Sequence, residues 1–278
     1  RIGDGGMLKN DAVQLEVRDT QHQGGVAVHV GVLTDGELHV GDHLHASVDV
    51  GARRAVARNH SATHLLHAAL RLVLGDHVQQ KGSLVAADRL RFDFTHDAPL
   101  EDSQIEAIED LANSWIEQNA QAAVREMSYP EAIESGAVAI FDEKYGDVVR
   151  VVQFGDFSTE LCGGTHAFAT GEIGLLKILS ESGIASGVRR IEALTGLGAL
   201  SHLRNQEKVL KSASELLRVS AAEVPTRIEK LLEDRRNAER EIERLRSAQR
   251  GQDSKDLPRD AREVSGGRVV AARVGGAE

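Results

Sequence analysis

The 278-residue chain is poor in cysteine and in aromatic residues, with one Cys and 3% Phe, Trp and Tyr together. One cysteine excludes an internal disulfide and is typical of a reducing compartment, so we predict a cytoplasmic protein. The low aromatic content argues against a surface that stacks the bases of single-stranded nucleic acid. No apolar run reaches the roughly 18 residues that a membrane-spanning helix needs, so we expect no membrane association.

The remaining composition is that of a globular protein, with 41% hydrophobic and 27% charged residues. The length predicts about two domains. The net charge of −10 confines any nucleic-acid contact to a local basic patch. The chain begins at Arg1 and stops shortly after the apolar stretch 268–274, which is typical of an opening strand. We therefore expect it to be a piece of a longer protein.

Hydrophobic patterning predicts an α+β fold. Apolar residues alternate through much of residues 1–52, which is typical of half-buried strands and indicates a partial β-barrel. Residues 53–200 mix helical and strand patterns, and we expect a hairpin at 82–95, a second helix after Pro99, and strands near 123–128, 147–154, 174–180 and 188–194. The elements follow no regular βαβ rhythm, which favours an antiparallel sheet with helices. Asn59 is a good N-cap and Gly75 a good stop, so we predict a helix between them.

Residues 201–250 are predicted to be a long helical segment. Ser220 and Glu223 have the spacing of a capping box. A seam repeats at intervals of three and four residues through Ile228, Leu231, Arg235, Ala238, Ile242 and Leu245. This seam fits a coiled coil, and an antiparallel helical hairpin fits it equally well. Residues 251–267 have the composition of a linker, and we assign 251–278 to that linker and the start of a further domain.

Two pairs of potential metal ligands carry the strongest chemical signal. His60 and His64 are four apart on the predicted helix, so their imidazoles share one face. Cys162 and His166 are also four apart, with two glycines between them. Three histidines and one cysteine would form a tetrahedral set suited to Zn²⁺. On spacing alone, a surface histidine pair with an inert buried cysteine remains an equal alternative.

The other histidines are expected to play no part in this site. His67 follows His64 by three residues, and we expect it on the helix surface. His39, His43 and His45 are expected to be solvated.

Five motifs together resemble the editing region of the bacterial alanyl-tRNA synthetase family. They are RNHSATHLL at 58–66, QKGSLV at 80–85, LRFDF at 90–94, CGGTH at 162–166 and GVRRIEA at 187–193. The same editing core is shared with threonyl-tRNA synthetases and with free-standing editing proteins. The resemblance implies hydrolysis of the aminoacyl ester of Ser-tRNA(Ala) and Gly-tRNA(Ala), with one Zn²⁺ held by the two ligand pairs.

The resemblance also implies a division of the chain. Residues 1–52 would be the end of a β-barrel subdomain, and 53–200 the editing core. Residues 201–250 would be a dimerisation segment that makes the parent protein a homodimer, and 251–278 the start of a C-terminal domain. ATP and Mg²⁺ would act only in the family's N-terminal ligase domain, so we expect no ligation of alanine from this chain.

Four further residues acquire expected roles from the resemblance. Thr63 and Gln80 would line the aminoacyl pocket, and tRNA(Ala) would be the partner. Arg189 and Arg190 are candidates for contacts with acceptor-stem phosphates, or for ion pairs within the protein. The alternatives are a free-standing trans-editing protein, an editing domain like that of threonyl-tRNA synthetase, and a non-catalytic zinc module that binds RNA.

Overall fold

A computed structural model describes residues 2–139, 145–256 and 261–270 of the chain. The chain divides into two compact units, Arg1–Arg204 and Asn205–Glu278. The fold is α+β, as predicted, and all pairs of named strands are antiparallel. Within the described ranges, no helix has both the length and the apolar character needed to cross a membrane.

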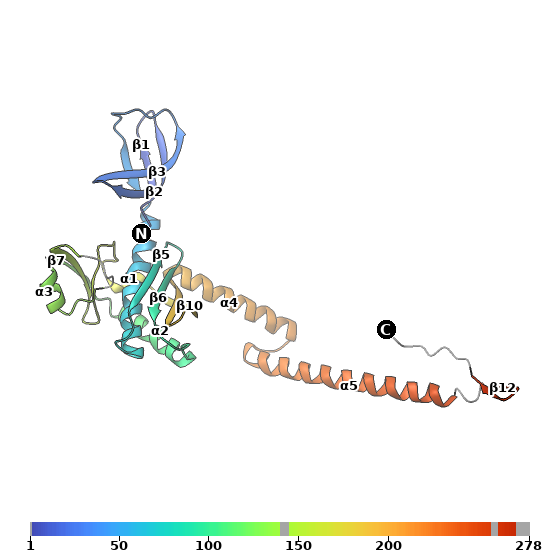
Figure 1. Cartoon of the computed structure of the whole chain (residues 1–278). Helices are drawn as coiled ribbons and strands as arrows, with labels where there is room; N and C mark the ends of the chain where they lie inside the picture. The colour runs from blue at the N-terminus through green and yellow to red at the C-terminus, as the bar shows by residue number, and fades with distance from the viewer. Residues whose placement is uncertain (1, 140–144, 257–260, 271–278) are drawn as a thin grey trace. The chain divides into compact units, whose positions relative to one another are not determined.

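The first strands form an open sheet. It contains β1 (Gly6–Lys9), β2 (Gln14–Gln23), β3 (Val26–Asp35) and β4 (His45–Val48), in the order β3-β2-β1-β4 (Figure 1). The alternating pattern predicts β2, β3 and β4 but misses β1. The expectation of half-buried strands is wrong for β3 and β4, which are almost wholly exposed. The two outer strands of the order are not paired with each other in the described structure, so the sheet forms no closed barrel. Part of a barrel is therefore not confirmed.

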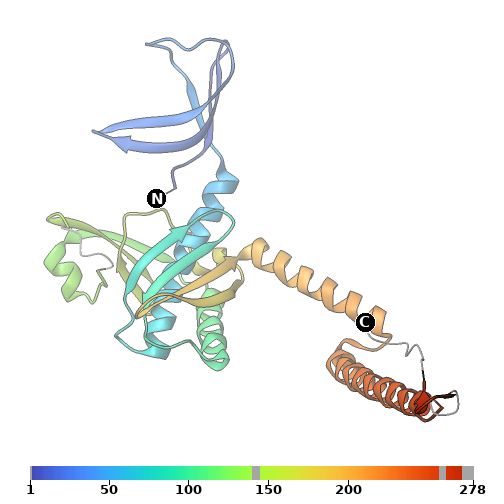
Figure 2. The ribbon, with the colours of Figure 1, turned by 45° about the vertical axis from the view of Figure 1, so that its right-hand side comes forward.

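The main core lies between a second sheet and two helices. The sheet has the order β10-β11-β6-β5 and is made of β5 (Gln80–Val85), β6 (Leu90–Thr95), β10 (Leu176–Ala185) and β11 (Val188–Thr195) (Figure 2). Helices α1 (Val50–Leu74) and α2 (Asp102–Glu117) contact it and each other. The predicted hairpin of β5 and β6 is confirmed, and β6 alternates fully buried residues with partly exposed ones.

Helix α1 begins earlier than predicted. Its N-cap is Asp49, whose carboxylate accepts a hydrogen bond from the Ala52 amide at 2.9 Å. The predicted N-cap, Asn59, is instead buried in the middle of the helix and donates its amide to the Ala86 carbonyl at 2.7 Å. The predicted end is correct, because Gly75 adopts φ 115° and its N–H donates to the Arg71 carbonyl.

A third, smaller sheet positions the second pair of candidate ligands. Its order is β7-β8-β9, with β7 (Ala122–Ser128), β8 (Val148–Phe154) and β9 (Ser158–Leu161). Helix α3 (Tyr129–Glu134) follows β7, and the short helix η1 (Thr170–Ile173) precedes β10. The pattern predicts β7, β8, β10 and β11, but it misses β9 and α3. Strand β9 ends directly before Cys162, so it sets the position of that residue.

The second unit is mostly helical. Helix α4 (Gly196–Leu217) spans the boundary between the units, and η2 (Ala221–Glu223) leads into α5 (Val224–Asp256). The capping box is confirmed, since Ser220 N–H donates to Glu223 Oε2 at 3.0 Å.

The predicted linker is wrong in part, because α5 continues to Asp256 and a hairpin of β12 (Arg262–Val264) and β13 (Gly267–Val269) follows. The last part of the predicted strand at 268–274 lies outside the described residues. The apolar seam residues of α5 are 41–53% exposed: Ile228, Leu231, Ile242 and Leu245. No partner helix covers them in the described structure, so the coiled coil stays a prediction.

Candidate metal centre

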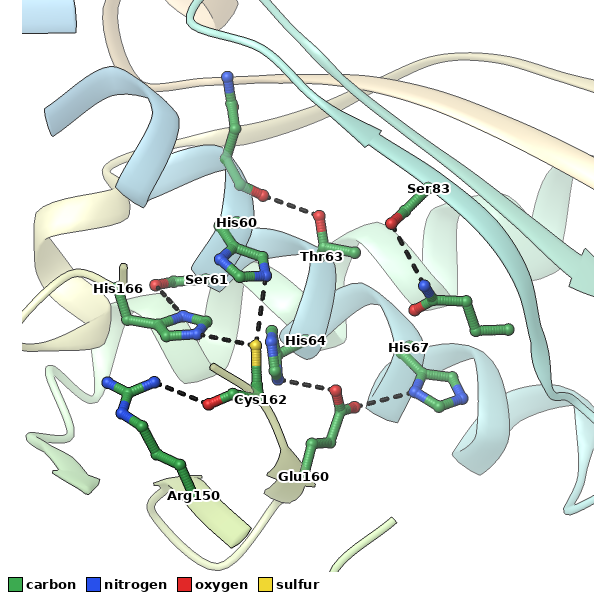
Figure 3. Close-up of polar contacts among 12 residues, drawn as sticks. His60, Ser61, Thr63, His64, His67, Ser83, Arg150, Glu160, Cys162 and His166 are labelled. Atoms are coloured by element: carbon green, nitrogen blue, oxygen red, sulfur yellow. Dashed lines mark hydrogen bonds and ion pairs between the residues drawn. The ribbon is translucent and has the colours of Figure 1, made fainter. Parts of the chain in front are cut away.

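The structure brings all four predicted ligands together. His60 and His64 lie on α1, while Cys162 and His166 lie on the loop after β9 (Figure 3). One ligand atom from each residue lies within 4.8 Å of the others. The Cys162 Sγ is 3.5 Å from His60 Nε2 and 3.3 Å from His166 Nε2. The alternative of a surface histidine pair with an inert buried cysteine does not describe this arrangement, because His64 is buried and the Cys162 thiol contacts two imidazoles.

Arg150 holds the CGGTH loop in place. This residue lies on β8, the strand paired with β9. Its guanidinium donates to the carbonyls of Cys162 at 2.7 Å and Gly164 at 2.9 Å. Charge-assisted hydrogen bonds of this kind are stronger than neutral ones. The Arg150 side chain therefore fixes the loop at Cys162 and at Gly164.

Each histidine of the cluster has its Nδ1 engaged by another group. The pairs are His60 with the Thr165 carbonyl (3.2 Å), His64 with Glu160 Oε2 (2.7 Å) and His166 with Ser61 Oγ (3.2 Å). A partner at Nδ1 leaves Nε2 as the atom that can bind a metal, and metal-binding histidines generally have such a partner. The second nitrogens of His60 and His166 do face the thiol.

The electrostatics favour a thiolate. Burial raises the pKa of Cys162, but hydrogen bonds from His166, His60 and His64 outweigh it and lower this pKa to about 3. Burial lowers the pKa of His166 to about 4, despite its hydrogen bond to Cys162. Thiolate and neutral imidazole are the forms that bind metals.

Glu160 and His64 form a buried ion pair. Burial opposes both charges, and their mutual attraction overcomes it, so the pKa of His64 is raised and that of Glu160 is lowered. His64 must therefore lose a proton before it can bind a metal.

These residues can hold one metal ion. Three imidazole nitrogens and one thiolate are a donor set of the kind that binds Zn²⁺ in proteins. Ligands of a tetrahedral zinc, with bonds of about 2.0–2.3 Å, stand roughly 3.3–3.8 Å from one another. The observed separations need only small side-chain movements to reach that geometry. The residues present therefore fit the predicted ion.

The predicted pocket residues lie on α1, which carries two of the donors, and on β5, which contacts α1. Thr63 is on α1, almost fully buried, and its hydroxyl donates to the Asn59 carbonyl at 2.8 Å. The lone pairs of that hydroxyl remain able to accept a hydrogen bond. Gln80 begins β5, and its amide donates to Ser83 Oγ at 3.2 Å.

The two predicted tRNA contacts are engaged inside the protein. Arg189 makes two hydrogen bonds to Glu181, at 2.5 and 2.6 Å. Arg190 makes two to Asp93, at 2.7 and 2.8 Å. The structure thus shows the ion-pair alternative for both residues, and a phosphate contact would have to compete with these carboxylates.

Sequence reasoning missed four residues around the cluster: Ser61, His67, Arg150 and Glu160. The expectation for His67 is wrong, because this side chain is 3% exposed and its Nδ1 lies 2.8 Å from Glu160 Oε1. His67 lies three residues after His64, so both histidines share a helix face. This spacing could have predicted that His67 lies beside the cluster. The expectation that His39, His43 and His45 are exposed is confirmed.

Comparison with known proteins gives a consistent result. The family profile described as "Threonyl and Alanyl tRNA synthetase second additional domain" matches residues 149–192, which include Cys162 and His166. The chain is 50% identical over 276 residues to an alanine–tRNA ligase of Halorhodospira halophila, covering 99% of this chain and 32% of the relative.

Two further relatives extend the comparison. The alanine–tRNA ligase of Stenotrophomonas maltophilia is 50% identical over 277 residues, with 99% of this chain and 31% of the relative covered. That of Thermoanaerobacter pseudethanolicus is 46% identical over 274 residues, with the same coverage of 99% and 31%. The chain thus spans about a third of the length of the curated relatives it matches.

Proposed function

We infer that this chain, a homologue of one segment of the alanine–tRNA ligases, hydrolyses the aminoacyl ester of mischarged tRNA(Ala). The observation that carries the proposal is the meeting of the HSATH turn of α1 with the CGGTH loop in a single cluster of four donors. The matched family profile covers the second of these motifs. We propose Ser-tRNA(Ala) and Gly-tRNA(Ala) as the substrates.

The chemistry of amino-acid selection explains why such a site is useful. A pocket that accepts alanine cannot strongly exclude glycine, which is smaller, or serine, which adds one hydroxyl. A second site that removes the wrong amino acid corrects these errors. Hydrolysis of the ester between the amino acid and the terminal ribose is the reaction this requires.

We propose that His60, His64, Cys162 and His166 hold one Zn²⁺. When bound, the ion supplies positive charge that can orient the aminoacyl group and polarise its carbonyl. Four protein donors complete a tetrahedral shell, and this favours substrate orientation over activation of a metal-bound water. The thiolate character of Cys162 and the engaged Nδ1 atoms of the histidines support this ligand set.

Specificity for serine is assigned to Thr63 and Gln80. Thr63 lies between two of the donors on α1, and Gln80 lies on β5, which contacts α1. Each offers a polar group with which a hydroxyl-bearing amino acid could hydrogen-bond. Correct Ala-tRNA(Ala) lacks that hydroxyl, so binding it would leave the polar groups of the pocket unpaired. This difference would protect the correct product from hydrolysis.

Three broader features belong to the same proposal. The partner is tRNA(Ala) in the cytoplasm.

The α5 seam, exposed in the described structure, is proposed to associate with another helix in a homodimer of the longer protein. Replacing both Leu231 and Ile242 by aspartate should then weaken self-association in sedimentation experiments, and unchanged association would exclude the seam as the interface.

The direct test measures release of serine from Ser-tRNA(Ala) by the 278-residue chain. We expect Cys162→Ala to lower the rate at least about 100-fold, the scale of losing several kcal/mol of charge stabilisation. The control is Glu126→Gln, at an exposed position of β7. A Cys162→Ala variant that remains as active as this control would exclude the metal-centred site. A chain that binds zinc and tRNA without hydrolysis would instead be a non-catalytic module.

A further inference from the structure

A single buried carboxylate joins two histidines of α1. Glu160 lies on β9 with its side chain 4% exposed, and its two oxygens contact different imidazoles. Oε2 is 2.7 Å from His64 Nδ1, and Oε1 is 2.8 Å from His67 Nδ1 (Figure 3). Both histidines are 2% exposed. One of them belongs to the donor cluster and the other does not.

The buried negative charge of Glu160 must be stabilised by nearby groups. An isolated buried carboxylate costs several kcal/mol, and only well-placed partners offset that cost. Here both oxygens have such partners. The contact with His67 is a hydrogen bond, and the contact with His64 is a close ion pair. A carboxylate attracts a protonated nitrogen and repels a lone pair, so each facing Nδ1 is expected to carry a proton. For His64 this determines the tautomer, with Nε2 left as the atom available to a metal.

His67 supplies the second half of this arrangement. Its Nδ1 is used by Glu160, while its Nε2 is buried without a hydrogen-bond partner among the described residues. An unpaired buried nitrogen is destabilising, so an apolar side chain would suit packing alone better. The hydrogen bond to Glu160 is the contact that distinguishes histidine from such a side chain.

We propose that Glu160 is a positioning residue that sets the metal-binding tautomer of His64, and that His67 holds Glu160 in the required orientation. The carboxylate rotates about its last bond, and a single contact to His64 would leave that rotation free. Anchoring the other oxygen on α1 removes this freedom. Because His64 and His67 are on the same helix, the carboxylate is held by a rigid pair of donors. The proposal rests on the metal centre of the proposed function, but not on the substrate.

The test measures Zn²⁺ affinity of the 278-residue chain by competition with a chelator, without tRNA. In Glu160→Gln the amide must place its NH₂ against one of the imidazoles. If it donates to His64 Nδ1, the proton moves to Nε2 and blocks the ligand atom. We expect a loss of affinity of about 10–100-fold, as is typical when the partner of a metal-binding histidine is removed. Glu126→Gln is the matched exposed control.

Two substitutions of His67 separate positioning from packing. His67→Gln retains an N–H donor for Glu160 and should keep affinity within about threefold of the parent. His67→Leu removes the donor and should weaken zinc binding by more than about tenfold. Equal affinity in the two variants would overturn the role given to His67.

A spectroscopic readout tests the tautomer itself. In protein labelled with ¹⁵N-histidine, long-range ¹H–¹⁵N correlations identify which nitrogen of His64 is protonated. We expect a protonated Nδ1 and a metal-bound Nε2 in the zinc form of the parent, and loss of this pattern in Glu160→Gln. Glu160→Asp, which is shorter by one methylene, provides the same comparison if the glutamine variant does not fold. Parental affinity and an unchanged pattern in the tested variant would overturn the proposal.

These results distinguish this proposal from the proposed function. A chain that binds zinc with the predicted tautomer and fails to hydrolyse Ser-tRNA(Ala) retains the positioning role and loses the editing role. A parent chain that binds no zinc overturns both.

Discussion

Gly164 lies directly against the imidazole of His60. A Cβ added at Gly164 would stand 2.1 Å from His60 Cε1 and 2.5 Å from His60 Nδ1. Those distances are far inside van der Waals contact, so any larger residue here must displace either the ligand or the loop. The second glycine of CGGTH is therefore a steric requirement of the donor cluster.

The first prediction concerns this contact. Gly164→Ala should weaken Zn²⁺ binding by more than about tenfold, because the added methyl pushes His60 away from the other donors. Affinity can be measured by chelator competition. Gly146→Ala is the control, since a Cβ at Gly146 would meet only the Val148 carbonyl, at 3.9 Å. Unchanged affinity in Gly164→Ala would show that His60 is not a ligand.

The second prediction concerns Arg150, which donates to two carbonyls of the loop. Arg150→Ala should lower the free energy of unfolding by about 1–3 kcal/mol, because two partly buried carbonyls lose a charged donor. Chemical denaturation measures this value. Arg125→Ala, at an exposed position of β7, should have little effect. Similar losses in both variants would mean that Arg150 contributes only general surface charge.

The third prediction concerns protons released on zinc binding. The raised pKa of His64 means that it carries a proton that zinc must displace, whereas the lowered pKa of Cys162 means that its thiolate is already formed. At pH 8, where unperturbed histidines are neutral, we expect release of about one proton per zinc. A cysteine with an ordinary pKa would still be mostly protonated at pH 8, so it would release most of a second proton on binding zinc.

Calorimetric titrations in two buffers with different ionisation enthalpies give this number. The sign follows from competition: zinc affinity should fall as the pH is lowered, because the displaced proton rebinds His64 more readily. Affinity that is independent of pH between 6 and 8 would contradict the buried pair of His64 and Glu160.

The spacing of the sequence predicted each pair of donors, but the resemblance was needed to predict that the two pairs, about 100 residues apart, form one site. Residues four apart on a helix share a face whatever surrounds them, so the pairing of His60 with His64 follows from spacing alone. The start of α1 was not predictable in the same way. Asp49 and Asn59 are both good N-caps, and the choice depends on Asn59 contacts with the distant Ala86 and Thr195.

Glu160 could not be predicted as a partner of His64 for a similar reason. The contact spans 96 residues in the sequence and depends on the pairing of β9 with β8. Strand β9 has only four residues, too few to show a clear pattern of alternation. The open sheet at the start of the chain shows the same limit. Alternation located β2, β3 and β4 but not β1, and closure depends on which strands pair, about which alternation carries no information.

The fourth prediction concerns selectivity. Thr63→Val removes the hydroxyl with little change in shape and should lower the ratio of Ser-tRNA(Ala) to Ala-tRNA(Ala) hydrolysis. One lost hydrogen bond is worth about 1–3 kcal/mol, which corresponds to a change of roughly 5–150-fold in that ratio. Gln80→Leu should shift it in the same direction. Single-turnover deacylation of both esters gives the ratio, and parental ratios in both variants would place discrimination elsewhere.

The most direct measurement of the central claim is the rate at which the chain deacylates Ser-tRNA(Ala) before zinc removal, after removal by a chelator, and after return of one equivalent of Zn²⁺. The account predicts loss of hydrolysis on removal and recovery at one equivalent, with no recovery in Cys162→Ala. Circular dichroism of the metal-free chain checks that the fold is retained. Hydrolysis that continues at the original rate in the folded, metal-free chain would contradict a metal-centred editing site.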